Sequence, residues 1–305
     1  MNTKQIHYIV TLAKEGTFSK AADVLKISQP SLSQYVKTIE KQLGVDLFDR
    51  VSGNLKLTDA GKTYLAYAKK MQSLERQLQS ELLDIKEFKK GTLTVGTTPF
   101  RSISMMPRIV SEFRKLYHDI EVVIEEKGTT ELLQMAQKGE FDLCLTTLPK
   151  EELVDVECDV IMEEEVLVAV SKDSLLHQKL QDHACVMINR KYPAVSCELL
   201  DQAEFVMLTE EQVMQRVLNR MCEEYDVQLR RVATVRSLEA LLKMVKEQVG
   251  AALLPTGIEE DDASVVFYSL QEELPRRKVA VLYKQNQYLS KIMLDMIQVM
   301  KDIKW

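Results

Sequence analysis

The sequence predicts a mixed α/β protein in which a helical N-terminal module and a long helix precede a body of strands and helices. Three observations support this fold class. Two short helical patterns within Phe18–Arg50 are joined by a tight turn. A helical pattern without Pro or an internal breaker then runs from about Asp59 to Phe88. Beyond residue 91, strand and helix patterns alternate, which is typical of parallel βαβ units.

The segment Phe18–Arg50 has the features of a helix-turn-helix. Ser19 is the predicted cap of the first helix, Lys26-Ile27 forms the turn, and Ser28 caps the second helix with Pro30 in its first turn. Inward-facing residues recur at helical spacing: Ala21, Ala22 and Leu25, then Leu32, Tyr35, Val36, Ile39 and Leu43. The exposed polar start of such a second helix can enter a DNA major groove.

A wing and a long helix follow the helix pair. Ser52-Gly53-Asn54 is turn chemistry between two short extended runs. Thr58 is the predicted cap of the long helix, which at about thirty residues would measure roughly 45 Å. Its apolar seam predicts a partner helix, with a surface helix packed on its own domain as the alternative. The seam residues are Tyr64, Ala68, Met71, Leu74, Leu78, Leu82 and Ile85.

Residues 1–89 resemble the winged helix-turn-helix and linker helix of the LysR-type transcriptional regulators. The resemblance rests on four motifs: Ala21-Ala22, Ser28–Ser33 (SQPSLS), Leu43–Arg50 (LGVDLFDR) and Leu57–Gly61 (LTDAG). It extends more weakly over the whole chain. It implies a sequence-specific regulator, not an enzyme, whose DNA binding or activation responds to a small-molecule effector.

The charge distribution agrees with a DNA-binding head. The net charge is −6 over 305 residues. Residues 1–90 hold 15 Lys and Arg against 10 Asp and Glu, and the remainder holds 25 against 36. A basic head on an acidic body provides local attraction for phosphates. No leader or membrane-length apolar run is present, so a cytoplasmic protein without a membrane partner is expected.

The five cysteines are expected to be free thiols, because their number is odd and no C-x-x-C occurs. Peroxide-sensing members of the family are similar around Leu208–Cys222. Cys222 matches only one of their two switch cysteines, and Val213 stands at the other position. This departure argues against a disulfide sensor of that type.

The second part of the chain reads as strands at 92–96, 121–126, 142–146, 166–170, 205–208, 232–235, 251–254 and 279–283. Helices are expected between them, including one from Ser102 to Leu116. The resemblance implies how they assemble: a two-lobed effector domain similar to periplasmic binding proteins. The implied units are 1–58 (winged helix-turn-helix), 59–89 (linker and dimerisation helix) and 91–305 (effector domain). Lobe I comprises 91–165 and 266–305, and lobe II comprises 166–265. At Gln248-Val249-Gly250 the family pattern would favour Gly-x-Gly, which puts the backbone of that turn in doubt.

The effector site is expected at the carboxyl ends of the strands, where helix N-termini favour carboxylates and other small anions. The loops at those ends are rich in hydroxyl groups. The predicted effector-binding residues are Thr97, Thr98, Pro99, Phe100, Arg101, Ser102, Thr129, Thr147 and Ser237. The alternative is that these hydroxyls only cap helices. Arg101 and Arg236 could hold an acid, although each alone fits a solvated arginine better.

The DNA contacts are expected from the second helix of the pair and the wing. Gln29, Pro30, Ser33 and Gln34 would meet base edges, with Ser28 at the helix start. Ser31, Lys37, Arg50 and Thr58 would hold phosphates. The wing itself is uncharged, with Lys56 as the nearby substitute, and a solvated surface residue is the alternative for Lys37.

The expected partners are double-stranded DNA carrying an interrupted inverted repeat, RNA polymerase, and further copies of the chain. The copies would form a dimer through 59–89 and a tetramer beyond it. No cofactor or metal is expected besides an effector of unidentified structure. The four histidines lack metal-ligand spacing, and no catalytic motif occurs. A solute-binding protein remains the other alternative, although it would not need residues 1–89.

Overall fold

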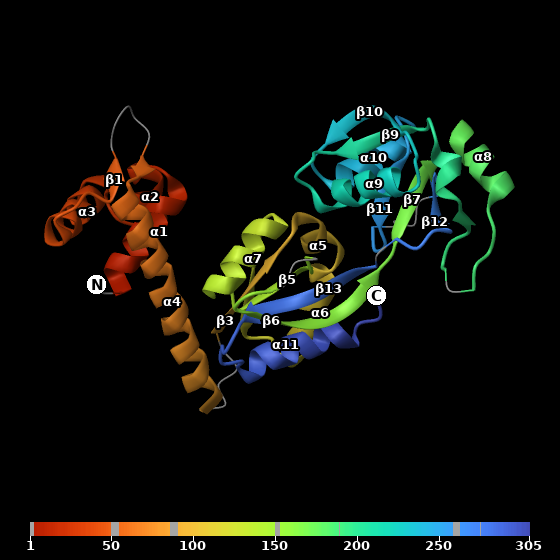
Figure 1. The fold of residues 1–305 in the computed structure, drawn as a ribbon. Helices are drawn as coiled ribbons and strands as arrows, with labels where there is room; N and C mark the ends of the chain where they lie inside the picture. Colours follow the sequence, from red (N-terminus) through yellow and green to blue (C-terminus); the bar gives the residue numbers. More distant parts are fainter. Residues whose placement is uncertain are drawn as a thin grey trace.

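The chain forms a helical head, a long helix and two α/β bodies, and β13 (Arg277–Lys284) returns it from the second body to the first (Figure 1). The computed structural model describes residues 3–49, 55–85, 91–149, 153–188, 190–258, 263–274 and 276–305. The long helix α4 (Asp59–Ile85) extends from the head towards the first α/β body (Figure 1). The mixed α/β class predicted from the sequence is confirmed.

The head contains three helices and a two-stranded hairpin. Thr17, and not the predicted Ser19, caps α2, because its hydroxyl accepts a hydrogen bond from the Lys20 N–H at 3.3 Å. Lys26 ends α2 in the left-handed conformation (φ 53°), which confirms the predicted turn. The elements are α1 (Thr3–Glu15), α2 (Phe18–Leu25), α3 (Gln29–Leu43), and the antiparallel strands β1 (Phe48–Asp49) and β2 (Lys56–Leu57).

The buried stripe of α3 confirms most of the predicted one. Leu32, Val36 and Ile39 are buried, whereas Leu43 is 47% exposed. Leu43 is the last residue of α3, because Gly44 ends the helix at φ 72°. Glu40 is also buried, and its carboxylate accepts hydrogen bonds from the backbone N–H groups of β1 and of the residue before it.

Helix α4 (Asp59–Ile85) begins at the predicted cap, since the Thr58 hydroxyl accepts a hydrogen bond from the Gly61 N–H at 2.9 Å. A Cβ at Gly61 would lie 1.9 Å from the Leu47 carbonyl oxygen, so only glycine fits there. Ala68 is buried, but large apolar residues of α4 are exposed: Tyr67, Met71, Leu74 and Leu78. The side chains of Leu82 and Ile85 lie outside the described part of the structure.

The first α/β body is built on a five-stranded sheet of order β4-β3-β5-β13-β6. β3 pairs in parallel with β4 and β5, and β13 runs antiparallel to β5 and β6. The strands are β3 (Gly91–Thr97), β4 (Ile120–Glu126), β5 (Leu143–Thr147), β6 (Val156–Glu164) and β13 (Arg277–Lys284). The helices are α5 (Pro99–Ser104), α6 (Met106–Leu116), α7 (Thr129–Lys138) and α11 (Lys291–Asp302).

The helix predicted from Ser102 to Leu116 is wrong in one respect, because two helices occupy that region. The break falls at Met105, directly before the start of α6. Pro107 lies in the first turn of α6. Proline has no N–H to donate to the preceding turn, so it is tolerated at a helix start and interrupts a continuous helix.

The second body holds a four-stranded sheet of order β11-β7-β12-β8 and a parallel pair, β9 and β10. β7 is antiparallel to both β11 and β12, so this body is not the purely parallel unit that the sequence indicated. The strands are β7 (Val166–Ser171), β8 (Ala194–Val195), β9 (Glu204–Leu208), β10 (Arg230–Val235), β11 (Ala252–Pro255) and β12 (Val265–Leu270). The helices are α8 (Leu175–His183), η2 (Cys197–Leu200), α9 (Val213–Glu224) and α10 (Leu238–Lys246).

Two crossovers join the bodies: Glu165 connects β6 to β7, and residues 271–276 connect β12 to β13. The sequence did not indicate β6 or β12. Because β12 pairs with β7 and β8, residues 266–270 belong to the second sheet and not to lobe I, where the sequence placed them. Gln248 takes the left-handed conformation (φ 60°), so the doubtful turn forms with a residue other than glycine. No helix in the described ranges is long and apolar enough to cross a membrane.

Candidate DNA-contacting helix and interlobe site

The N-terminal end of α3 presents polar side chains to solvent. Ser28 caps the helix by accepting a hydrogen bond from the Ser31 N–H at 3.3 Å, and the two hydroxyls lie 2.6 Å apart. Ser33 is half-buried. The remaining predicted contact residues of this helix are exposed: Gln29, Pro30, Gln34 and Lys37. The helix therefore exposes the side chains that the prediction requires.

Thr58 and Arg50 are the two other predicted DNA contacts. The Thr58 hydroxyl donates to the Asp46 carbonyl at 2.6 Å, so its proton is not available to a phosphate. Arg50 and the turn Ser52–Asn54 lie outside the described residues. Lys56 is exposed on β2 beside that turn.

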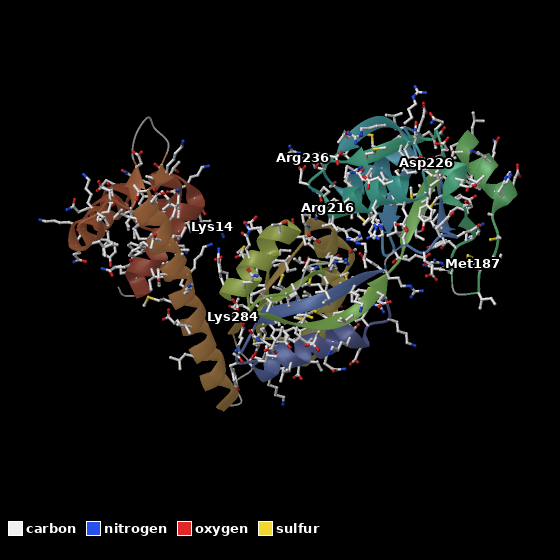
Figure 2. The ribbon with its side chains drawn as sticks, in the orientation of Figure 1. Lys14, Met187, Arg216, Asp226, Arg236 and Lys284 are labelled. Carbon is white, nitrogen blue, oxygen red and sulfur yellow. The ribbon has the colours of Figure 1, made fainter. Side chains whose placement is uncertain are left out.

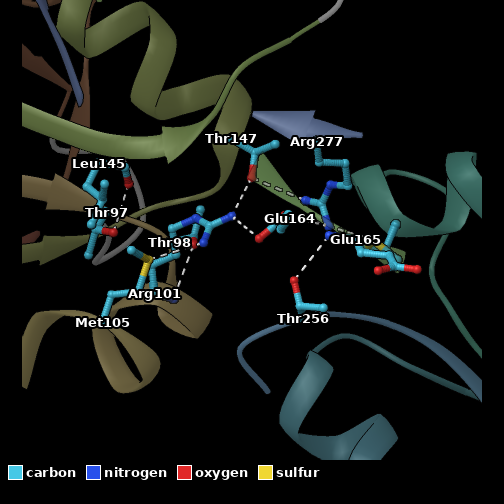
Figure 3. Close-up of polar contacts among 11 residues, drawn as sticks. Thr97, Thr98, Arg101, Met105, Leu145, Thr147, Glu164, Glu165, Thr256 and Arg277 are labelled. Atoms are coloured by element: carbon cyan, nitrogen blue, oxygen red, sulfur yellow. Dashed lines mark hydrogen bonds and ion pairs between the residues drawn. The ribbon is translucent and has the colours of Figure 1, made fainter. Parts of the chain in front are cut away.

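A buried charged cluster lies where the two crossovers meet the first body (Figure 3). Arg101 of α5 donates from Nη2 to the Thr147 hydroxyl at 2.7 Å and to Glu164 Oε2 at 2.9 Å. Arg277 Nη2 donates to the same hydroxyl at 3.2 Å, and its Nη1 lies 3.1 Å from Glu164 Oε1. Arg101 is 3% exposed, so the expectation of a solvated arginine is wrong. Its guanidinium is buried because Glu164 and Thr147 supply acceptors inside the fold.

The cluster carries a surplus positive charge. Two guanidinium groups share one carboxylate, and arginine stays protonated in proteins. The other donors reach weak acceptors: Arg101 Nη1 contacts the Met105 sulfur at 3.3 Å and Arg277 Nη1 contacts the Met214 sulfur at 2.6 Å. Arg277 Nε is buried and has no hydrogen-bond partner among the described residues. Burial lowers the pKa of Arg277; Glu164 opposes this shift and Arg101 adds to it. The described contacts thus leave one guanidinium charge of the cluster without a carboxylate partner of its own.

Apart from Arg101 and Thr147, the predicted effector residues form no hydrogen bond or ion pair with Glu164 or Arg277 within the described ranges, and two of them cap helices. The Thr97 hydroxyl is buried and donates to the Leu145 carbonyl at 2.9 Å, so it is committed to the sheet. Thr98 caps α5 and Ser237 caps α10, each by accepting from a backbone N–H. Arg236 is exposed at the surface of the second body, as expected (Figure 2). Thr129 lies in the first turn of α7. Thr129, Phe100 and Ser102 are partly exposed, and Pro99 is exposed.

A cavity of about 410 Å³ lies between the two bodies. Of the predicted effector residues, Phe100 and Arg101 line it, and the others lie outside its lining. The structure thus brings Arg101 and Thr147 together and adds Glu164 and Arg277, which sequence reasoning missed. Their sequence context gives no signal, because Glu164 is one of three consecutive glutamates and Arg277 one of two consecutive arginines.

Four of the five cysteines lie in environments that raise the pKa of their thiols. Burial raises the pKa of the Cys144 thiol to about 12. The pKa values of Cys158, Cys197 and Cys222 are also raised, chiefly by burial. Since the thiolate is the reactive form, these environments disfavour oxidation. Within the described ranges, no group of three or more His, Cys, Asp or Glu side chains could hold a metal ion.

A winged helix-turn-helix head followed by a two-lobed α/β body defines a class of ligand-responsive transcriptional regulators. The family comparisons agree over nearly the whole chain. Residues 86–304 match the LysR substrate binding domain, and residues 3–62 match the bacterial regulatory helix-turn-helix protein, lysR family. The chain therefore belongs to the LysR family, which consists of transcriptional regulators and not enzymes.

Individual relatives cover most of the chain. The uncharacterized HTH-type transcriptional regulator YcgK of Bacillus subtilis is 26% identical over 304 residues, covering 95% of this chain and 91% of its own. A probable RuBisCO transcriptional regulator of Synechocystis is 26% identical, with coverage of 94% and 82%.

Solved structures share the fold. A full-length OxyR variant from Pseudomonas aeruginosa has a TM-score of 0.72 at 23% identity, covering 100% of this chain and 99% of its own. CbnR in complex with its target DNA has a TM-score of 0.69 at 16% identity, covering 99% of both chains.

Proposed function

We propose that this LysR-type regulator senses a small carboxylate, or a similar anion, bound between its two lobes. The observation that carries the proposal is the surplus positive charge of the Arg101–Glu164–Arg277 cluster. A buried charge is stable when it is paired and hydrogen-bonded. A carboxylate could replace the methionine sulfurs as acceptor and receive two parallel N–H bonds from a guanidinium.

The position of the cluster supports coupling to lobe movement. Arg101 and Thr147 belong to the first body. Next to the crossovers, Glu164 is the last residue of β6 and Arg277 is the first residue of β13. Met214 belongs to α9 of the second body. An anion held by Arg277 near Met214 would contact both lobes. It would favour the closed arrangement, provided that this arrangement binds it better than the open one.

The proposed units are 1–58 as the DNA-binding head, 59–89 as the dimerisation segment, and 91–305 as the effector domain. The exposed apolar residues of α4 support a dimer, because such a stripe is stable when another helix covers it. Two heads would then read an interrupted inverted repeat. Assembly to a tetramer and contact with RNA polymerase are further parts of the proposal.

Within the head, we propose base contacts from Gln29, Pro30, Ser33 and Gln34, with phosphate contacts from Ser31 and Lys37. Their exposure at the start of α3 supports these roles. Thr58 is left out of the phosphate set because its hydroxyl proton is committed to Asp46.

The ligand class is tested by thermal denaturation with three groups of compounds: small carboxylates, the corresponding neutral amides, and amines. The expected hit is a carboxylate that also changes protection of the DNA upstream of the protein's own gene. Thr98→Ala and Ser237→Ala should abolish this response and keep DNA binding. A normal response in both variants would show that these loops do not form the site.

A further inference from the structure

We infer that the 410 Å³ cavity is a second small-molecule site, which adjoins the proposed effector cluster, and that it takes a monoanion with an apolar body. Its volume falls within the range of about 300–1,000 Å³ that is usual for small-ligand pockets. Its walls come from α5 and α6 of the first body, from the ends of both crossovers, from the second body, and from Trp305.

The positive charge of this cavity comes from Arg108 on α6. Arg108 Nη1 donates to the Lys304 carbonyl at 2.9 Å, and its guanidinium lies 6.0 Å from the centre of the Trp305 ring. Both partners are neutral, and none of the ion pairs between described residues involves Arg108. Its charge is therefore available to an acid, and Lys191 adds a second positive group to the wall.

The acidic residues of the cavity already have cationic partners. Glu164 pairs with Arg101 at 2.9 Å, Glu165 pairs with Arg190 at 2.7 Å, and Glu163 lies 3.7 Å from Arg276. They therefore repel an incoming anion less than unpaired carboxylates would. With these acids paired, the wall around Arg108 favours a negatively charged ligand.

A polar atom in the lining also lacks a partner. The Ser104 hydroxyl oxygen is buried, and no hydrogen bond satisfies it within the described part of the chain. Ser104 lines the same cavity. Buried hydroxyl groups are normally hydrogen-bonded. A ligand oxygen would satisfy this group, which is an observation independent of the charge on Arg108.

The rest of the lining suits an apolar body. Phe100, Met105, Met162 and Trp305 contribute ring and thioether surface, and Met105 is 4% exposed. Methionine adapts its shape to a ligand, and aromatic rings pack against flat apolar groups. An anion with a hydrocarbon or aromatic body therefore matches both parts of the wall.

The cavity shares only part of its lining with the proposed effector cluster. Arg277, Thr147 and Met214 do not line it, whereas Arg276, the chain neighbour of Arg277, does. Arg101 and Glu164 belong to both sites. A ligand in the cavity would thus touch the pair that holds the effector cluster, and the two ligands would influence each other's affinity.

Trp305 reports on this site, because it is the single tryptophan of the chain. The experiment titrates the full-length protein with phenylacetate and, separately, with its neutral analogue phenylacetamide, while tryptophan emission is recorded. Phenylacetate should change the emission saturably, and phenylacetamide should bind at least about tenfold more weakly because it lacks the charge.

Three variants locate the binding. Arg108→Gln should raise the Kd of phenylacetate at least about tenfold. Arg114→Gln, an exposed arginine of the same helix outside the cavity, should leave the Kd unchanged and serves as the matched control. Arg277→Gln, which changes a cluster residue outside the cavity lining, should also leave it unchanged.

A non-saturable emission change, equal affinity for the amide, or an equal loss in both arginine variants would overturn the inference. Loss of binding only in Arg277→Gln would assign the ligand to the proposed effector cluster instead. Because Arg108 is exposed, Arg108→Gln is expected to fold; circular dichroism and the melting temperature verify this before titration.

Discussion

Arg101 Nη2 lies 2.9 Å from Glu164 Oε2, and the two side chains are 3% and 0% exposed. Arg277 approaches the same carboxylate from the start of β13. The ion pairs thus connect α5 of the first lobe to β6 and β13 next to the crossovers. A buried carboxylate between two arginines is hard to remove, since both cations would lose their counter-ion.

Glu164→Gln should destabilise the fold strongly. Removing one partner of a buried ion pair typically costs about 3–5 kcal/mol, because it leaves uncompensated charge inside the protein. Urea unfolding measures this loss. Glu163→Gln is the matched control, since Glu163 is 42% exposed and 3.7 Å from its partner, and surface changes usually stay within about 0.5 kcal/mol. Equal stability of the two variants would contradict the structural role of Glu164.

Gln34→Ala should reduce sequence discrimination. An exposed glutamine on the groove-facing helix can form two hydrogen bonds to adenine, worth about 1–3 kcal/mol of discrimination. Gel-shift titrations on the promoter fragment and on random DNA separate this effect from general affinity. Equal loss on both DNAs would remove Gln34 from base reading.

Lys37→Ala should weaken binding to both DNAs to a similar extent. Losing one phosphate contact lowers the slope of log K against log salt by about 0.9. The measurement is the salt dependence of binding for the wild type and the variant. An unchanged slope would mean that Lys37 is a solvated surface residue.

Leu74→Glu should convert the protein to monomers. Leu74 is 64% exposed on α4, in a row with other exposed apolar residues, and a charge there would oppose helix pairing. Light scattering after size exclusion gives the mass. Lys62→Glu changes an exposed polar residue of the same helix and should keep the wild-type mass. A dimeric Leu74→Glu protein would place the interface elsewhere.

Much of this architecture could be predicted from the sequence, because it depends on local signals. Caps and helical spacing identified α3 and the start of α4. The break at Met105 shows the limit, since an apolar period continued across it. The strand β6 was missed because its pattern mixes exposed charged residues with apolar ones. Pairing with distant strands fixes both β6 and β12. Two of the four cluster residues, Arg101 and Thr147, were predicted, because they lie at or after the ends of strands. Glu164 and Arg277 were not predicted, because only the arrangement of the crossovers brings them next to the other two.

Cys144 should make the fold sensitive to alkaline pH. Its folded pKa is raised from 9.0 to about 12 by burial. A raised folded pKa favours the folded state fully below the unfolded value, and this advantage is lost as pH rises from 9 towards 12. Urea unfolding at about pH 8 and about pH 10 should therefore show a smaller alkaline loss in Cys144→Ala than in the wild type. Cys185→Ala, at an exposed position, is the control, and identical losses in both variants would exclude this role.

The surplus charge at Arg277 is tested most directly by thermal denaturation of Arg277→Gln with the carboxylate panel. This variant should fold, because it leaves Arg101 and Glu164 as a balanced pair. A ligand at about 100 times its Kd stabilises by about 2.7 kcal/mol, a shift of several degrees. We predict this shift for a carboxylate in the wild type and in the exposed control Arg236→Gln, and its loss in Arg277→Gln. An equal shift in Arg277→Gln, or stabilisation of the wild type by neutral or cationic ligands alone, would contradict an anion site at the cluster.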